Sequence, residues 1–194
     1  MITMPIEIYS DGASSHNPGP SGYAWIIRYW ETPEGSDLPE AKIVEGNQGY
    51  RLSTNNRMEI LGGITGLKEV MNKIKDGTFV GATQINLTTD SEYFAKAINQ
   101  RWIDKWMQNN WMTSGFKGSA PKPVKNKDLW EKFVEVQNDI KNSGITLTIT
   151  HVLGHNGHEF NERADKLAVA ASMDNANYLV DEEYEKSVSN YNRN

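Results

Sequence analysis

The sequence predicts an α/β fold, a mixed five-stranded sheet with helices on its faces. Three strand-like segments follow one another near the start of the chain. Two further strands then alternate with segments whose apolar residues recur at helical spacing. The expected order of elements is therefore βββαβαβα, which a chain of 194 residues is long enough to fold as one domain.

The first three strands are expected at residues 6–12, 22–30 and 42–52. The segments "IEIYSDG", "GYAWIIRYW" and "KIVEGNQGYRL" are rich in β-branched and aromatic residues, which suit a pleated, half-buried surface. A polar loop with Pro and Gly, at residues 31–41, separates the second strand from the third. Three consecutive strands predict an antiparallel meander.

The first helix is expected at residues 56–75. Met58, Leu61 and Ile64 begin a series of apolar residues spaced by three or four positions, which indicates one buried helix face. Three glycines inside this stretch each cost up to about 1 kcal/mol relative to alanine. Either a neighbouring strand approaches the helix closely there, or the helix is less stable than it could be.

The second half of the chain alternates strands and helices. A strand is expected at residues 83–90, followed by a helix that Asp90 and Ser91 can cap. The Trp-rich segment 98–126 predicts a short helix that runs into a loop. The remaining elements are a helix, the last strand and an Ala-rich helix, at residues 127–141, 144–152 and 161–172.

The globular domain is expected to span residues 1–173. The remaining residues, 174–194, are polar, acidic and rich in Asn, which is typical of an appendage that is partly disordered. The sequence shows no internal repeat, so a single core is expected.

The composition excludes several classes of protein. Hydrophobic residues at 38% and charged residues at 23% are typical of a globular domain, and no apolar run approaches the roughly 18 residues that span a bilayer. The first residues do not resemble a secretion signal. The absence of cysteine excludes disulfides and thiolate metal sites and fits a reducing compartment. We therefore expect a cytoplasmic protein with no membrane partner.

The net charge of −5 hides a local surplus of positive charge. Between Lys96 and Lys141 the chain has nine basic residues against five acidic ones. Local charge, more than the total, governs where a polyanion docks. This segment is therefore a candidate surface for a nucleic acid.

Four acidic residues stand at the ends of these elements. Asp11 closes the first expected strand and Asp90 closes the fourth. Glu59 and Asp165 lie in the first turns of two expected helices. Each acid alone has an ordinary explanation, as a turn residue, a helix cap or a charge that the helix dipole favours. If the two strands are parallel neighbours, however, Asp11 and Asp90 emerge at the same end of the sheet.

Four acids at one edge of a sheet would repel one another unless a cation compensates them. Ligation by oxygen alone suits Mg²⁺ or Mn²⁺ rather than zinc. A pair of such ions is the usual apparatus for in-line attack of water on a phosphodiester. If the acids converge, they would form a site for two Mg²⁺ ions, for which Mn²⁺ can substitute, but their spacing alone does not prove that they converge.

A second group of potential metal ligands lies in the segment "THVLGHNGHEFNERAD". Its candidates are His151, His155, His158, Glu159, Glu162 and Asp165. A zinc hydrolase would need two or three of these imidazoles to converge with another protein ligand. The last two histidines, however, are expected on a Gly-containing loop and not on one face of a helix. Zinc remains an alternative for this segment considered alone.

Several motifs of the chain occur together, in this order, in a known family. They are "YSDGASSHNPGPSGYAW", "STNNRMEI", "TTDSEY", the Trp-rich segment with "KPVKN" and "DLW", and "GHNGHEFNERADKLA". On these motifs, which extend over residues 6–172, the chain resembles ribonuclease H of type 1, the bacterial-like enzymes that cut the RNA strand of RNA/DNA hybrids. The resemblance implies a monomeric endonuclease of the ribonuclease H-like fold that leaves 3′-hydroxyl and 5′-phosphate ends.

The resemblance also implies roles for individual residues. The four acids Asp11, Glu59, Asp90 and Asp165 look like the family's metal-binding catalytic residues. His155, on the loop before the last helix, looks like its histidine that assists proton transfer or product release. The residues implied to contact the minor groove of the hybrid are Asn17, Asn55 and Asn56. Those implied to hold phosphates, or to support that hold, are Thr54, Arg57 and Asn126. A basic, Trp-rich protrusion adds Trp102, Trp106, Trp111, Lys122 and Lys125.

The chain also departs from the family's pattern. Glu92 stands where bacterial members commonly have Gln, which adds a negative charge beside the expected metal site. The protrusion has "MQNN" where a basic cluster is expected, and each lost phosphate contact flattens the salt dependence of binding. An alternative is therefore a module that binds RNA/DNA hybrids with weak or no activity. A related exonuclease is disfavoured, because such enzymes usually carry Asp-x-Glu on the first strand, where this chain has "DGA".

Overall fold

The computed structural model describes residues 4–115, 119–154 and 157–191. Its core is a five-stranded sheet in the order β3-β2-β1-β4-β5. The strands are β1 Ile6–Ser14, β2 Gly19–Glu31, β3 Glu40–Ser53, β4 Gln84–Thr89 and β5 Thr146–His151. The first three pair antiparallel, and β4 is parallel to both β1 and β5. Within these ranges no helix is long and apolar enough to cross a membrane.

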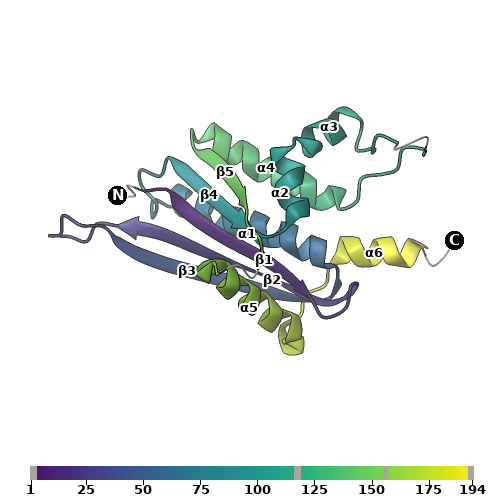
Figure 1. The fold of residues 1–194 in the computed structure, drawn as a ribbon, viewed down its shortest axis with the longest axis horizontal. Coiled ribbons are helices and arrows are strands. Elements are labelled where there is room, and N and C mark those ends of the chain that lie inside the picture. The colour runs from purple at the N-terminus through teal and green to yellow at the C-terminus, as the bar shows by residue number, and fades with distance from the viewer. Residues whose placement is uncertain (1–3, 116–118, 155–156, 192–194) are drawn as a thin grey trace.

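Helices cover both faces of this sheet, as Figure 1 shows. Helix α5 lies on one face, and α1, α2 and α4 lie on the other. The helices are α1 Asn55–Lys75, α2 Glu92–Asn99, α3 Trp102–Gln108, α4 Lys127–Asn142, α5 Glu159–Met173, a short 3₁₀ turn η1 Asn175–Asn177 and α6 Glu182–Tyr191. The mixed α/β sheet is the one that the sequence predicts, and the two helices expected after β4 are α2 and α3.

The main core lies between the sheet and the helices α1, α2 and α4. Ile8 of β1 and Leu67 of α1 are fully buried there, as is Trp130 of α4, which packs its indole against Phe94 and Phe133. The opposite face, under α5, is filled by small side chains, among them Ala13, Ala24 and Ala168. Small residues there let α5 approach the strands closely.

The glycines of α1 mark places where the helix touches the sheet. A Cβ atom on Gly62 would lie 3.1 Å from the backbone oxygen of Asp11, and one on Gly66 would lie 2.9 Å from Cγ2 of Ile8. A Cβ on Gly63 would lie 2.6 Å from the Phe94 ring. The close approach of β1 therefore accounts for Gly62 and Gly66, and the packing of Phe94 from α2 accounts for Gly63.

The segment after residue 173 folds back onto the domain. The backbone N–H of Leu179 donates to the carbonyl oxygen of Gly49 at 2.9 Å, which places the segment beside β3. The side chain of Asp181 is buried and forms an ion pair with Arg57. The sequence indicated only a polar appendage here, and the boundary after residue 173 stays a prediction.

Candidate active site

Asp11 lies inside a strand. β1 continues to Ser14, and Asp11 pairs across the ladder with Ala24 of β2. Its side chain is only 5% exposed, and one carboxylate oxygen accepts a hydrogen bond from the backbone N–H of Gly12 at 2.7 Å. The expectation that Asp11 closes the strand was therefore wrong, because the pairing with β2 extends three residues further.

Asp90 follows β4 directly, as the sequence predicts. β1 and β4 are parallel and in register from the pair Ile6 and Ile85 to the pair Tyr9 and Thr88. Two residues beyond the last of these pairs stand Asp11 on one strand and Asp90 after the other. The loop after β5 also reaches this edge, since a Cβ on Gly154 would lie 2.9 Å from a carboxylate oxygen of Asp90.

Glu59 is held by hydrogen bonds to both carboxylate oxygens. The side-chain amide of Asn55 donates to Oε1 at 2.6 Å, and the hydroxyl of Ser91 donates to Oε2. Glu59 lies in the second turn of α1, and not in the first, because the helix begins at Asn55. The Ser91 contact joins α1 to the start of α2 at the edge where Asp90 lies.

Asp165 is half-buried on α5 and also lies in the second turn of its helix. The sequence placed it in the first turn, whereas α5 begins two residues earlier than expected, at Glu159 after the N-cap His158. Its charge acts on Asp11. The acids on β1, after β4, on α1 and on α5 therefore share one electrostatic environment.

This environment raises the pKa of two of the acids. Burial, together with the negative charges of Asp90, Asp165 and Glu59, raises the pKa of Asp11 to about 8, although the hydrogen bond from Gly12 opposes the shift. Burial raises the pKa of Glu59 to about 7, assisted by the charge of Asp90 and opposed by the hydrogen bonds from Ser91 and Asn55. In the described part of the chain, no lysine or arginine forms an ion pair with any of the four acids. Among the described residues, the negative charge of the four acids is therefore not compensated by an ion pair.

The donor set at this site fits a hard divalent cation. The four side chains offer only carboxylate oxygens, which suit Mg²⁺ or Mn²⁺, and a cation would relieve the repulsion that raises the pKa of Asp11. Within the described residues, no three His, Asp or Glu side chains stand close enough together to form a complete metal cage. Both carboxylate oxygens of Glu59 accept hydrogen bonds, one from Asn55 and one from Ser91.

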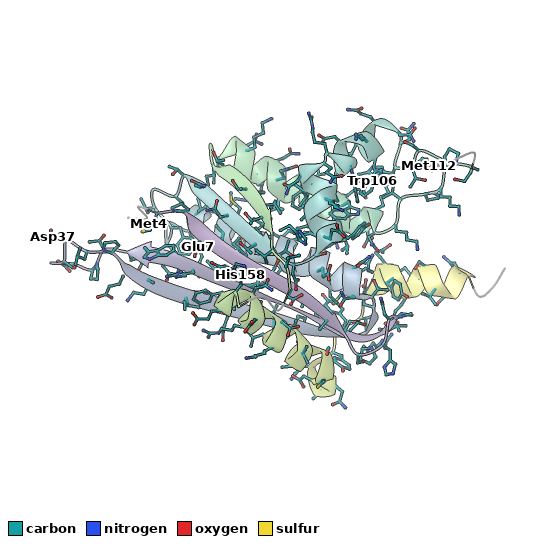
Figure 2. All side chains as sticks on the ribbon, viewed as in Figure 1. Met4, Glu7, Asp37, Trp106, Met112 and His158 are labelled. Atoms are coloured by element: carbon teal, nitrogen blue, oxygen red, sulfur yellow. The ribbon has the colours of Figure 1, made fainter. Side chains whose placement is uncertain are left out.

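The histidines have different surroundings. His155 lies outside the described residues, so its expected role stays a prediction. Nε2 of His151 lies 3.2 Å from the backbone carbonyl oxygen of Asp90. His158 is the N-cap of α5 without a side-chain capping bond (Figure 2). Neither described histidine belongs to a group that would support the zinc alternative.

A cleft of about 910 Å³ contains six of the predicted hybrid contacts. It is lined by the predicted residues Asn17, Thr54, Asn56, Arg57, Lys125 and Asn126. The amide of Asn17 also meets α1 directly, since its Oδ1 accepts the backbone N–H of Asn55 at 3.3 Å. The structure therefore brings together residues that are up to 109 positions apart in the sequence, from Asn17 to Asn126.

The side chain of Arg57 in this cleft is buried and contacts three other side chains. Its Nε and Nη2 donate to Asp181 at 2.7 and 2.8 Å, and its Nη1 and Nη2 donate to Asp128 at 2.9 and 2.7 Å. A further contact of 3.5 Å joins Nη1 to Oδ1 of Asn126. These contacts occupy all five guanidinium donors. Arg57 therefore supports the cleft, and in this arrangement it has no donor left for a phosphate.

The sequence did not predict six residues that line the same cleft: Pro123, Val124, Asp128 and three residues of the last helix. The last three are Glu183, Tyr184 and Ser187 of α6. The spacing of Glu182 and Lys186, an ion pair four residues apart, is a signal for a helix there. No signal in the sequence places that helix beside Lys125 and Asn126.

The three predicted tryptophans are half-buried. Trp106 packs against Trp102 at 6.1 Å and against the core residue Trp130 at 5.8 Å, measured between ring centroids. Trp111 lies 5.9 Å from the ammonium group of Lys127. Each therefore packs partly against the core, and the Trp-rich segment extends beyond Trp106 towards Met112 in Figure 2.

Glu92 and Lys122 have local partners. Glu92 forms an ion pair with Lys96 one turn along α2, and the hydrogen bond from Lys96 lowers the pKa of Glu92. The backbone of Lys122 is paired with Thr113, which closes the protrusion as a short antiparallel loop. The extra charge of Glu92 is thus partly compensated by a neighbour on the same helix.

The chain matches known proteins over most of its length. A family model described as RNase H matches residues 4–173. A protein named Ribonuclease H from Idiomarina loihiensis is 39% identical over 163 residues, which are 84% of this chain and 85% of the relative. One named Ribonuclease HI from Synechocystis is 36% identical over 181 residues, which are 93% of this chain and 95% of the relative.

Solved structures are also similar. A crystal structure of LC9-RNase H1, described as a type 1 RNase H, is 28% identical with a TM-score of 0.62, over 96% of this chain and 82% of the other. The structure of LC11-RNase H1 in complex with an RNA/DNA hybrid is 25% identical with a TM-score of 0.52, over 86% of this chain and 95% of the other. The fold class that the sequence predicts is confirmed.

Proposed function

Because the chain belongs to the RNase H family, we propose that it hydrolyses the RNA strand of RNA/DNA hybrids at Asp11, Glu59, Asp90 and Asp165. The observation that carries this assignment is Asp11, a buried acid whose pKa is raised to about 8 beside three other acids, with no basic partner among the residues that the structure describes. A relative of the same family has been crystallised with an RNA/DNA hybrid, which supports the choice of substrate.

The family is metal-dependent, and we propose that the four acids hold two Mg²⁺ ions, for which Mn²⁺ substitutes. Such ions supply an activated water and stabilise the oxygen that leaves the phosphorus. In this chain Asp11 and Asp90 supply ligands from neighbouring strands. Glu59 supplies a third, oriented by Asn55 and Ser91, and Asp165 a fourth from α5.

The remaining catalytic assignment concerns protons. His155 is proposed to assist proton transfer or product release, since an imidazole titrates near neutral pH. It lies in the connection between β5 and α5, and the neighbouring Gly154 approaches Asp90 closely. The 3′-hydroxyl and 5′-phosphate ends would follow if water attacks the phosphorus and the 3′ oxygen leaves with a proton.

The hybrid is proposed to lie across the cleft beside α1. Asn17, Asn55 and Asn56 offer amides to the minor groove, where RNA displays its 2′-hydroxyls. Thr54 and Asn126 are proposed to contact phosphates, with Arg57 supporting them. The protrusion adds aromatic and basic groups, namely Trp102, Trp106, Trp111, Lys122 and Lys125.

The substitution Asp11→Asn tests this function. It keeps the size of the side chain and removes the charge that a cation needs, so we expect cleavage of a labelled hybrid to fall by a factor of about 10² or more. Asp37→Asn, in the exposed loop at the far end of the molecule (Figure 2), is the matched control and should retain full activity. Full activity of Asp11→Asn would show that the metal site is assigned wrongly.

A comparison of substrates separates the enzyme from a hybrid-binding module. We expect cleavage of the hybrid, and not of RNA/RNA or DNA/DNA duplexes, and loss of cleavage in EDTA. Hybrid binding without cleavage at any Mg²⁺ or Mn²⁺ concentration would favour the binding module. The ion pair between Glu92 and Lys96 weakens the case for that module, because it partly compensates the charge that motivated it.

We further propose that the protein acts as a monomer in the cytoplasm. The lack of cysteine supports a reducing compartment. The mass in solution, measured by light scattering with and without hybrid, tests the oligomeric state.

A further inference from the structure

Helix α6 forms part of the wall of the cleft that contains the proposed hybrid contacts. Glu183, Tyr184 and Ser187 line it together with Lys125 and Asn126. Positions 183 and 187 are one turn apart, so these side chains lie on the same face of the helix. In Figure 1 α6 lies next to the N-terminal end of α1, where Arg57 contacts Asp181.

This wall is firmly attached to the domain. Asp181, directly before α6, accepts hydrogen bonds from Arg57 and from the hydroxyl of Ser53. Arg51 of β3 donates two hydrogen bonds to the carboxylate of Glu185, at 2.9 and 2.6 Å. The guanidinium of Arg57 also lies 5.9 Å from the ring centroid of Tyr184. α6 is therefore a fixed part of the cleft in this arrangement.

Glu183 brings a negative charge to this wall. Its side chain is 59% exposed, and its carboxylate pairs with Lys186 at 3.1 Å, a lysine that Glu182 also approaches at 3.6 Å. An exposed pair of this kind is weak, and one lysine cannot neutralise two acids. The charge of Arg57 is already matched by two carboxylates. Among the described residues that line the cleft, Lys125 is the basic group without an ion pair.

We propose that α6 belongs to the hybrid-binding surface and that Glu183 weakens binding by repelling the phosphate backbone of the hybrid. The occupant is a phosphate backbone because the lining offers amide, hydroxyl and ammonium donors, the groups that contact phosphates. This inference rests on the proposed function, which supplies the hybrid. It adds a residue that lowers affinity to a cleft whose other lining acid, Asp128, is paired with Arg57.

Two matched pairs of substitutions test the proposal. Glu183→Gln and Glu182→Gln each remove one charge and one partner of Lys186, but Glu182 does not line the cleft. Ser187→Glu and Ser189→Glu each add one charge at an exposed serine bonded to a backbone carbonyl, and Ser189 faces away from the cleft. The readout is polarisation of a fluorescent RNA/DNA hybrid in EDTA, where binding is measured without cleavage.

We expect Glu183→Gln to bind the hybrid about two- to fivefold more tightly at low salt, and Ser187→Glu to bind it more weakly by a similar factor. Their partners Glu182→Gln and Ser189→Glu should change the affinity less than twofold. The differences should shrink at high salt, because salt screens exposed charges. Thermal unfolding of each variant checks that it is folded.

Each other outcome has a distinct meaning. Equal shifts within each pair would show that only the net charge of the protein matters, and would overturn the proposal. Unchanged affinity in Glu183→Gln and Ser187→Glu, with a wild-type chain that binds the hybrid, would overturn it as well. A wild-type chain that neither binds nor cleaves the hybrid would instead refute the proposed function, and this inference with it.

Discussion

At the scale of single residues, Asp11 carries an electrostatic cost that the protein alone does not offset. Its carboxyl group is buried on β1, receives one backbone hydrogen bond, and faces the charges of other acids. With a pKa of about 8, the group is largely protonated at neutral pH unless a cation joins it. The uncompensated negative charge that causes this cost would also favour the binding of a divalent ion.

This cost predicts how stability depends on pH when metal is absent. Between the ordinary pKa of 3.8 and the folded-state pKa of about 8, native Asp11 holds a proton that the unfolded chain has released. The free energy of unfolding therefore falls as the pH rises through this window. Glu59 acts in the same direction between 4.5 and about 7. Urea unfolding in EDTA at pH 5 and pH 8 should show a loss on the order of a few kcal/mol.

The variant Asp11→Asn is the control for this measurement. It cannot titrate, so its stability should fall less than that of the wild type between the two pH values. Adding Mg²⁺ at pH 8 should stabilise the wild type and have a smaller effect on the variant. The same pH dependence in both proteins would contradict the assignment of the loss to Asp11.

At the scale of elements, the position of Glu59 depends on how closely α1 packs against β1. A Cβ on Gly12 would lie 2.4 Å from the backbone nitrogen of Glu59, and Gly62 of α1 approaches the backbone of Asp11 in turn. The two elements touch through their backbones, so neither can yield by moving a flexible side chain. Gly12 and Gly62, which have no side chain, therefore allow the close approach that sets the distance between Asp11 and Glu59.

Gly12→Ala tests this packing. The added methyl must push α1 away from β1, which should cost about 1 to 3 kcal/mol of stability. It should also lower cleavage of the hybrid at least about tenfold, because small displacements of catalytic groups are costly. Gly22→Ala is the control, since its Cβ would meet the backbone of α5 at 2.6 Å, at Ser172, seven residues beyond Asp165. Gly22→Ala should lose about as much stability as Gly12→Ala. At a temperature where both variants are folded, it should retain more cleavage activity than Gly12→Ala.

At the scale of the whole molecule, the end of the chain completes a buried ion network. Asp181 pairs with Arg57 although 124 residues separate them, and Asp128 of α4 is the second partner. The network joins α1, α4 and the segment before α6 in one place. Removing one partner of a buried ion pair is costly, because the other charge is left uncompensated.

A truncation after Met173 is therefore expected to destabilise the domain by about 3 to 5 kcal/mol. A truncation after Asp181 keeps the ion network and should cost much less. Urea unfolding of both truncated chains and of the full chain measures their free energies of unfolding. If the chain ending at residue 173 is as stable as the full chain, the predicted domain of residues 1–173 is independent of the tail.

The order of strands and helices, and the fold class, follow from the sequence alone because they depend on local patterns. Apolar periodicity, β-branched runs and capping residues act over a few neighbouring positions. The candidate acids were found the same way, each at or near the end of an element. Errors of two or three residues arose where pairing or packing extends an element, as at Asp11 on β1 and Asp165 on α5.

Only the tertiary structure decided which distant residues meet. The Arg57 network and the place of Glu183 in the cleft depend on how the chain's end returns to α1 and β3. No local pattern encodes that return, because a buried Arg–Asp contact is recognised only when both partners are placed in space. The burial that raises the pKa of Asp11 is likewise a property of the packed sheet and its helices.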